Sequence, residues 1–303
     1  MTPFTEHNIY FGDSRKLNKI DCESIRLIIT SPPYWQLGGN HGPENRIGRS
    51  NSYEEYINSL NLVWTECYRV LSGGCRMCVN IGYQFARSAY YGRYKVIPVR
   101  DEIIRYCEAL GFDYMGAVIW RTTGSAAGEA SIIGSYLYPR NGIIKLDYEY
   151  ILIFKKLGNP PDVSDEIKEA SKLTKEEWKK YFYGHWNFPG AKKSVLPPPF
   201  PEELPKRLIK MFSFKGETIF DPFLGSGTTS LAALKLERNS AGYELNKDYK
   251  DIIYEKINDG ITIDCDGLVN IYDDEAVPDL KSLEANLIYK FKDFVGIKRI
   301  AHE

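Results

Sequence analysis

The hexapeptide Thr-Ser-Pro-Pro-Tyr-Trp at residues 30–35 directly follows the apolar run at residues 25–29. Two prolines end a strand abruptly, because proline fixes φ and has no N–H for the next hydrogen bond of a sheet. The Ser31 hydroxyl and the Pro32 carbonyl are then held side by side and can accept both hydrogens of one exocyclic amine, while the Tyr34 ring stacks on the heterocycle that carries it. The pattern predicts a site for a nucleobase amino group; the alternative is a Pro-Pro turn with a chance tyrosine.

A second stretch, at residues 217–229, combines a strand, a glycine turn and the start of a helix. Gly225 and Gly227 allow the backbone to approach a ligand at the helix N-terminus, and Asp221 at the strand tip offers a carboxylate to a cationic group. The stretch lacks the lysine of a phosphate-binding Gly-x-x-x-x-Gly-Lys loop, and Leu224 excludes a Gly-x-Ser-x-Gly hydrolase elbow. The remaining option is a cofactor without a triphosphate.

Two further acids end short strand-like runs. Glu244 closes the run at residues 238–244, at the spacing from the glycine turn where an acid accepts hydrogen bonds from ribose hydroxyls in a mononucleotide-binding half. We therefore predict Glu244 as the ribose residue. Asp13 and Ser14 follow the run at residues 9–11, and the alternative for Asp13 is a turn-capping aspartate.

Together these stretches resemble the amino-methylating DNA methyltransferases. Ser-Pro-Pro-Tyr at residues 31–34 resembles their catalytic tetrapeptide, and Ser rather than Asp at its first position is similar to the cytosine-N4 branch. Residues 221–229, Asp-Pro-Phe-Leu-Gly-Ser-Gly-Thr-Thr, resemble the S-adenosylmethionine motif of the same family. The catalytic motif precedes the cofactor motif, an order that resembles the β class. The resemblance extends from Ile9 to Asn258.

The resemblance implies a set of site residues and no metal. The implied catalytic residues are Ser31, Pro32, Pro33 and Tyr34. The implied cofactor-binding residues are Asp13, Ser14, Phe200, Asp221, Pro222, Phe223, Gly225, Ser226, Gly227, Thr228 and Glu244. Asp13 resembles the Gly-Asp element that faces the adenine of the cofactor. Phe200 is carried over although Leu196-Pro197-Pro198 replaces the usual His-Pro-Ala that precedes it in the family.

The implied function is a sequence-specific DNA methyltransferase that transfers a methyl group from S-adenosylmethionine to N4 of a flipped-out cytosine in double-stranded DNA. Accepting both amine N–H bonds at Ser31 and Pro32 turns the nitrogen toward sp³ geometry. Because the methylated ammonium is strongly acidic, no base with a tuned pKa is required, and we expect the histidines to be structural or surface residues. The target must leave the base stack, and Tyr34 replaces its stacking partner.

Three alternatives stay open. The same geometry serves the N6 amine of adenine, since a single Ser-for-Asp difference is weak evidence for cytosine over adenine. The chain could instead be a non-catalytic DNA-specificity subunit of the same fold, although intact Ser31, Asp221, Gly225 and Glu244 argue against this. An RNA substrate is the third alternative, because free-standing enzymes need no appended RNA-binding module.

Composition limits the remaining properties. The chain has 303 residues, 43% of them hydrophobic, no apolar stretch of the length of a membrane span, and no signal peptide pattern at its N-terminus. Six cysteines without framework spacing indicate buried free thiols and a reducing, cytoplasmic setting. The resemblance implies a prokaryotic, nucleoid-associated protein. The net charge of −1 is uneven, with −4 in residues 261–303 and +3 in the rest. The partners that the resemblance implies are double-stranded DNA, a cognate restriction endonuclease and a second copy in a homodimer; no membrane is expected.

The hydrophobic pattern predicts an α/β fold with a doubly wound sheet of about seven strands that alternate with helices. The resemblance implies that this sheet is the mostly parallel, Rossmann-like sheet of the methyltransferases and that it carries a small target-recognition insertion. Strands are predicted near residues 8, 25, 217 and 239 and at 75–81, 114–120 and 148–154. Helices are predicted from the capping box at residues 52–55, at about 96–110 and at 164–181. The predicted units are a catalytic half (1–156), the target-recognition insertion (157–193), a cofactor half (194–260) and an acidic C-terminal extension (261–303).

Two stretches outside the predicted sheet are candidate DNA contacts. Residues 35–51 form a Gly/Asn/Arg-rich loop after the tetrapeptide, and we predict that Arg46 and Arg49 lie near phosphates. The insertion ends in an aromatic and amide cluster from which we predict Trp186 as a DNA contact, and residues 121–141 are a further candidate. The alternative for the loop and for the insertion's charges is a solvated surface.

Overall fold

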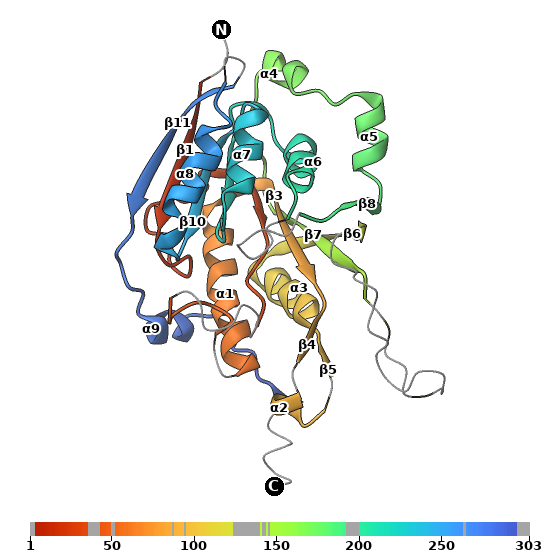
Figure 1. Cartoon of the computed structure of the whole chain (residues 1–303), viewed down its shortest axis with the longest axis vertical. Coiled ribbons are helices and arrows are strands. Elements are labelled where there is room, and N and C mark those ends of the chain that lie inside the picture. The colour runs from red at the N-terminus through yellow and green to blue at the C-terminus, as the bar shows by residue number, and fades with distance from the viewer. Residues whose placement is uncertain are drawn as a thin grey trace.

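A large mixed sheet with helices on both faces organises the chain (Figure 1). The computed structural model describes residues 4–35, 43–49, 52–86, 88–93, 95–123, 140, 144, 146–191, 200–262 and 265–295. The main sheet has nine strands in the order β11-β1-β10-β9-β2-β3-β7-β6-β8. Neighbouring strands are parallel except at β7, which runs antiparallel to β3 and β6. The predicted doubly wound, mostly parallel sheet is therefore present.

All seven predicted strands are present, and the sheet has one additional strand at each edge. The seven are β1 (Phe4–Phe11), β2 (Ile25–Thr30), β3 (Leu71–Gly82), β6 (Phe112–Thr123), β7 (Tyr148–Lys156), β9 (Thr218–Asp221) and β10 (Asn239–Glu244). The edge strands are β8 (His185–Pro189) and β11 (Asp266–Asp273), and β4 (Gln84–Ala86) with β5 (Lys95–Ile97) forms a separate hairpin. The count of seven was too low because both edge strands interrupt their apolar residues with polar ones and so lack a continuous apolar run.

Alternation along the central strands divides the core into two layers. In β2, Ile28 packs with α1 and α3, whereas Leu27 and Ile29 pack with α6 and α7. A third cluster lies between α8 and β1. The helices are α1 (Tyr53–Val70), α2 (Ser88–Tyr91), α3 (Val99–Leu110), α4 (Asp165–Ala170), α5 (Lys175–Tyr181), α6 (Glu203–Phe212), α7 (Thr228–Lys235), α8 (Lys250–Asn258) and α9 (Leu280–Ala285), with a 3-10 turn at Lys247–Tyr249.

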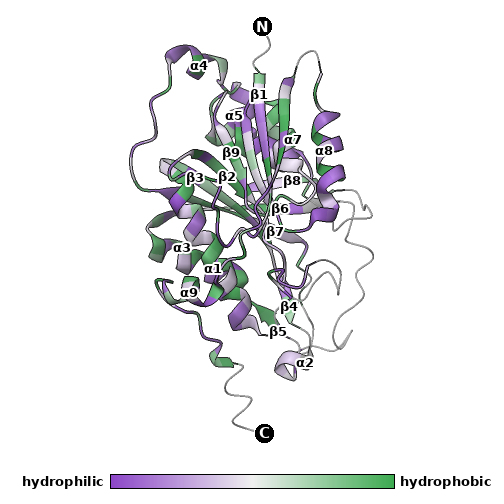
Figure 2. Ribbon diagram, turned by 90° about the vertical axis from the view of Figure 1, so that its left-hand side faces the viewer, coloured by the Kyte–Doolittle hydropathy of each residue, from purple (hydrophilic) through white to green (hydrophobic). Residues whose placement is uncertain are grey.

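Figure 2 shows hydrophilic, purple residues on the outer helices α4 and α8. None of the described helices is both long and apolar enough to cross a membrane.

All six cysteines are free thiols, as predicted, but Cys22 is exposed and two others are only half-buried, so the prediction that all are buried was wrong.

Local capping explains where the helices begin. The Ser52 hydroxyl accepts a hydrogen bond from the Glu55 N–H at 3.1 Å and starts α1 at the predicted place. The single helix predicted over residues 164–181 is two short helices. Thr174 and Glu177 form a complete capping box, which starts α5 as a separate helix after α4 has ended at Ala170.

The predicted target-recognition insertion lies mainly at the edge of the sheet opposite to Ser31. It follows β7, which is antiparallel, so α4 and α5 extend from the edge where the parallel strands begin. Figure 1 shows α4 at the top, beside the N-terminal end of β1, and β4, which follows the end of β3, at the bottom. The limits 157–193 stay a prediction, but within them β8 is part of the main sheet. The other candidate, residues 121–141, lies mostly outside the described residues.

The C-terminal extension is integrated into the fold. β11 pairs with β1 over its whole length, and the following segment crosses α1. The buried Asn58 amide clamps the backbone of Phe291, donating to its carbonyl at 3.2 Å and accepting from its N–H at 2.8 Å. The Tyr53 and Phe291 rings meet edge to face at 5.4 Å. The extension therefore supports the helix that packs behind the catalytic strand.

We expect Asn58→Ala to lower the free energy of unfolding by about 1–2 kcal/mol, because two hydrogen bonds to the Phe291 backbone are lost. Urea denaturation measures this change, and limited proteolysis should detect earlier cleavage near residue 291. Asn286→Ala is the matched control, since its exposed amide bonds only the Ser282 carbonyl. Equal stability and cleavage of the two variants would show that the clamp does not hold the extension.

Candidate functional site

Four adjacent strands bring the predicted site residues to one edge of the sheet. In the order β2, β9, β10 and β1, each strand pairs in parallel with the next, so their C-terminal ends lie in a row. Ser31 follows β2, Asp221 ends β9, Glu244 ends β10 and Asp13 follows β1. Ligands of open α/β sheets bind outside this edge. The structure thus brings together residues that are up to 231 positions apart in the chain.

The Ser-Pro-Pro-Tyr tetrapeptide presents two acceptors that the protein leaves unused. Neither the Ser31 hydroxyl nor the Pro32 carbonyl makes a hydrogen bond within the described part of the chain. The Tyr34 hydroxyl, by contrast, accepts a hydrogen bond from the Gly82 N–H at 2.8 Å, which fixes the ring. Burial and the nearby Glu149 charge raise the pKa of Tyr34 above its ordinary value, so the phenol stays neutral.

Side chains from other elements hold the backbone of this loop. The Gln84 amide pairs with the backbone of the buried Trp35, accepting from its N–H at 2.9 Å and donating to its carbonyl. Tyr56 of α1 donates to the Pro33 carbonyl at 3.0 Å. The prolines restrict the backbone angles of the loop, and these hydrogen bonds fix its position. The acceptors at Ser31 and Pro32 are therefore preorganised.

Asp221 accepts hydrogen bonds from three donors inside the protein. Its Oδ1 accepts from the Thr30 hydroxyl at 2.7 Å and from the Phe223 N–H at 3.0 Å, and its Oδ2 accepts from the Thr229 hydroxyl at 2.7 Å. The side chain is 1% exposed, and burial raises its pKa to about 6. The expectation that this carboxylate faces a cationic group is corrected, since three internal donors surround it. Its place among the cofactor-binding residues stays a prediction.

Glu244 closes the glycine loop. Its Oε2 accepts from the Gly225 N–H at 2.8 Å and its Oε1 accepts from the Asn246 N–H at 2.8 Å. Burial, aided by the Asp221 charge and opposed by these N–H groups, raises the pKa of Glu244 to about 7. Gly225 and Gly227 have φ of +56° and +81°, the left-handed region that the turn requires.

Asp13 lies beside Glu244, because Phe11 pairs with Glu244 across β1 and β10. The Asp13 carboxylate is buried in an ion pair with Arg15, whose Nε donates to it at 2.9 Å, and it also caps the Arg15 N–H at 3.0 Å. The turn-capping alternative is therefore present. A contact with adenine stays a prediction for Asp13 and Ser14, both of which are buried.

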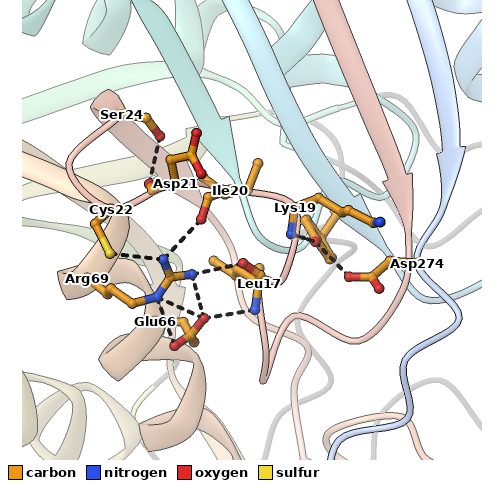
Figure 3. A network of polar contacts seen from close by, with 10 residues as sticks. Leu17, Lys19, Ile20, Asp21, Cys22, Ser24, Glu66, Arg69 and Asp274 are labelled. Carbon is orange, nitrogen blue, oxygen red and sulfur yellow. Dashed lines mark hydrogen bonds and ion pairs between the residues drawn. The ribbon is translucent and has the colours of Figure 1, made fainter.

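A polar network holds the segment that follows Asp13 (Figure 3). Arg69 of α1 donates to the carbonyls of Leu17 at 2.8 Å and Ile20 at 3.0 Å, and Glu66 accepts from the Leu17 N–H at 2.8 Å. Burial disfavours the Glu66 charge, but Arg69 and the Leu17 N–H outweigh it and lower the pKa of Glu66. The network fastens this end of the site to the same helix that supports Pro33.

The segment at residues 43–49 packs against the catalytic loop. A Cβ at Gly48 would lie 2.5 Å from the Tyr34 carbonyl oxygen, and Arg15 donates to the Asn45 carbonyl at 2.9 Å. This segment carries Arg46 and Arg49, and their contact with phosphates stays a prediction.

Trp186 is not a surface residue. It is 1% exposed, its indole N–H donates to the Tyr181 carbonyl at 3.1 Å, and Arg207 lies over its ring. The prediction of a DNA contact at Trp186 is corrected, because β8 turns this ring into the core between the sheet and α6. Alternation along β8 was the sequence signal that could have shown this.

Several supporting residues had no strong sequence signal. Thr30 and Gln84 act only through partners that are distant in sequence. Lys256 of α8 donates to the Ser226 hydroxyl at 2.9 Å and to the Thr228 hydroxyl at 2.7 Å, and so braces the start of α7. Two residues that the sequence did indicate as cofactor contacts lie nearby: half-buried Phe200 packs at the start of α6, and Phe223 packs edge to face on Trp64. Their contact with the cofactor stays a prediction.

The residues present fit S-adenosylmethionine. The turn between β9 and α7 leaves the backbone of Gly225 open, and a Cβ there would have only one atom as near as 4.0 Å. Glu244 keeps further lone pairs for ribose hydroxyls beyond the two N–H groups that it binds. Within the described residues no group of three or more His, Cys, Asp or Glu could hold a metal ion.

Comparison with known proteins agrees with this geometry. Residues 25–255 match the DNA methylase family model of the N6/N4 type. The chain belongs to this DNA methylase family. Type II methyltransferase M.MjaI of Methanocaldococcus jannaschii is 38% identical over 282 residues, covering 84% of this chain and 91% of the relative. Type II methyltransferase M.MthZI of Methanothermobacter thermautotrophicus is 32% identical and covers 86% and 78%.

Solved structures extend the comparison. A DNA modification methylase of Thermus thermophilus, complexed with S-adenosyl-L-methionine, has a TM-score of 0.72 and 30% identity, over 89% of this chain and 100% of that one. The cytosine-N4-specific PvuII DNA methyltransferase has a TM-score of 0.60 at 18% identity, over 91% and 99%, and shows the shared fold. This DNA methylase uses S-adenosylmethionine and has the fold of the methyltransferases that depend on it.

The raised pKa of Glu244 predicts a pH-dependent stability. The folded state holds this proton up to a pH of about 7, whereas an unfolded glutamate releases it near its ordinary pKa. The stabilisation from the proton is therefore complete below the unfolded pKa and is lost as the pH rises to about 7. Relative to Glu244→Gln, the wild type should lose on the order of 1–3 kcal/mol of unfolding free energy across this window.

Urea unfolding at several pH values measures this difference. Glu166→Gln, a change at an exposed residue of α4, is the control and should follow the wild type throughout. A constant offset between the wild type and Glu244→Gln would contradict the assigned protonation.

Proposed function

We propose that this DNA methylase is a sequence-specific enzyme that methylates the exocyclic N4 of cytosine in a flipped-out base. The observation that carries the proposal is the pair of unused acceptors at Ser31 and Pro32 beside the fixed ring of Tyr34. The serine at the first position supports cytosine over adenine, since the resemblance of the tetrapeptide is to the cytosine-N4 branch.

The acceptors act on the amine itself. A cytosine amine is conjugated with its ring and is a poor nucleophile. When Ser31 and Pro32 accept its two N–H bonds, the lone pair leaves conjugation and points out of the base plane. S-adenosylmethionine supplies an electrophilic methyl group on its sulfonium. The neutral Tyr34 ring stacks on the base and replaces the neighbours that it loses on leaving the duplex.

The cofactor residues are proposed with distinct tasks. Glu244 receives the ribose hydroxyls, Asp13 and Ser14 border the adenine, and the turn at residues 222–228 with Phe200 covers the rest of the cofactor. Asp221 acts through Thr30 and Thr229, which it holds in place. Arg46 and Arg49 contact backbone phosphates near the target, since their segment packs on the Tyr34 loop.

The relatives are type II methyltransferases, and their names support a role in restriction-modification. We infer a cognate restriction endonuclease as functional partner and a prokaryotic cytoplasm, at the nucleoid, as the place of action. Adenine N6 is the second candidate base, because the family model covers both types.

The modified base is the decisive readout. We expect DNA from a host that expresses the chain to contain N4-methylcytosine in one sequence context, because Ser31 and Pro32 accept the hydrogens of an exocyclic amine and serine at the first position of the tetrapeptide resembles the cytosine-N4 branch. Nucleoside mass spectrometry identifies the base, and single-molecule sequencing identifies the context. Finding N6-methyladenine instead would overturn the cytosine assignment, and finding no methylation by the purified chain would exclude catalysis.

Ser31→Ala and Tyr34→Ala should fail at different steps. Ser31→Ala removes an acceptor used as the amine pyramidalises, and should lower the single-turnover rate by about a hundredfold or more with little change in binding. Tyr34→Ala should lose base stacking of about 1–3 kcal/mol, with a smaller loss for Tyr34→Phe. A 2-aminopurine probe at the target position should brighten with Ser31→Ala and less with Tyr34→Ala. Wild-type rates in Ser31→Ala would refute its role.

A further inference from the structure

Two polar side chains from neighbouring strands meet at the hydroxyl end of Tyr34. Asn80 lies in β3 and Glu149 in β7, and the Asn80 Nδ2 donates to Glu149 Oε2 at 2.6 Å. Because β7 is antiparallel, its first residues lie at the edge where the parallel strands end, and Glu149 pairs with Gly82 at the end of β3. The Asn80–Glu149 pair therefore lies at the catalytic edge of the sheet.

Gly82 joins this pair to the catalytic loop. A Cβ at Gly82 would lie 2.7 Å from the Tyr34 hydroxyl and 3.1 Å from Glu149 Cγ, so both side chains approach the same glycine. The Glu149 carboxyl is also close enough to shift the pKa of Tyr34 upward. The Glu149 carboxyl therefore lies near the hydroxyl end of the ring on which the base is proposed to stack.

The pair is not satisfied within the described part of the chain. Asn80 is 4% exposed, yet its Oδ1 has no hydrogen-bond partner among the described residues. Glu149 Oε1 likewise bonds to no described residue, while Oε2 is held by Asn80. Since buried polar groups in proteins are nearly always paired, the arrangement indicates that a polar ligand completes it.

We propose that Glu149, in its protonated form, donates a hydrogen bond to the ring nitrogen beside the exocyclic amine of the flipped base, which is N3 in cytosine. This inference rests on the proposed function, because the base is placed on Tyr34. Thymine carries a hydrogen at the corresponding nitrogen and cannot accept the bond. Glu149 thus selects an amino base, and Asn80 is the positioning residue that aims the carboxyl.

The surroundings of Glu149 favour its neutral form. Burial raises its pKa, and the Asn80 amide opposes the shift. Tyr34 faces it from the catalytic loop, Trp120 lies opposite it in β6, and no lysine or arginine forms an ion pair with it in the described chain. An acceptor nitrogen on the base stabilises the protonated carboxyl and raises the pKa further.

The test compares two duplexes that carry the sequenced recognition site, one with cytosine and one with 3-deazacytosine at the target, in which a C–H replaces N3. Wild-type single-turnover rates should be about tenfold lower on the 3-deaza duplex. Glu149→Ala should be about tenfold slower on cytosine and should no longer discriminate between the duplexes. Glu166→Gln should behave as the wild type.

A pH series distinguishes this contact from a merely structural role. Wild-type rates should fall as the pH rises through the raised pKa, because the proton is lost. Glu149→Gln, whose amide donates at every pH, should keep about a third or more of the rate and lack that fall. Binding of S-adenosylmethionine by calorimetry confirms that the variants are folded.

Equal wild-type rates on the two duplexes would overturn the proposal, and this arm needs no variant. Undiminished discrimination by Glu149→Ala, or the wild-type pH dependence in Glu149→Gln, would overturn it as well. A wild-type chain that methylates no cytosine duplex would instead refute the proposed function on which it rests.

Discussion

The buried carboxylate of Asp221 joins the two halves of the site. It accepts from Thr30, at the end of the catalytic strand, and from Thr229, in the first turn of the helix that follows the glycine loop. These donors are far apart in the chain, and no other described carboxylate bridges both motifs. Its burial is unfavourable for the charge, as the pKa near 6 shows, and the three donors offset that cost. Together with the pairing of β2 and β9, this side chain holds the Ser-Pro-Pro-Tyr loop close to the glycine loop.

Hydrogen bonds from several elements likewise position the loop that carries Ser31 and Pro32. Prolines restrict its backbone, but Gln84, Tyr56 and the Gly82 N–H determine where it lies, and they come from three different elements. A loop held at several points loses little entropy when the base arrives, and its acceptors need no rearrangement as the amine changes geometry. The unused acceptors are thus part of a rigid frame, which is why removing one should affect rate more than binding.

The sequence predicted the central strands and both motifs because these depend on local patterns: apolar runs, a glycine turn and paired prolines. It failed where tertiary context decides. Asp221 was expected to face a ligand, but strand pairing surrounds it with hydroxyls from distant residues. Trp186 was expected at a DNA surface, but the alternation of buried and exposed residues along a short edge strand places it in the core. The sequence did not indicate Glu149 as a site residue, because only the antiparallel direction of β7 brings the start of that strand to the edge that carries Ser31.

The antiparallel direction of β7 also determines which segments lie at each edge of the sheet. β2 ends at the edge that carries Ser31 and continues into the Tyr34 loop, whereas β7 ends at the opposite edge and continues into α4 and α5. Charges on those two helices are consequently far from Ser31, and ion pairs at positions i and i+3 satisfy several of them locally. The two proposed phosphate contacts, Arg46 and Arg49, lie instead in a segment that Gly48 and Asn45 join to the Tyr34 loop and to Arg15. A net charge near zero is therefore compatible with DNA binding, because the relevant charge is local.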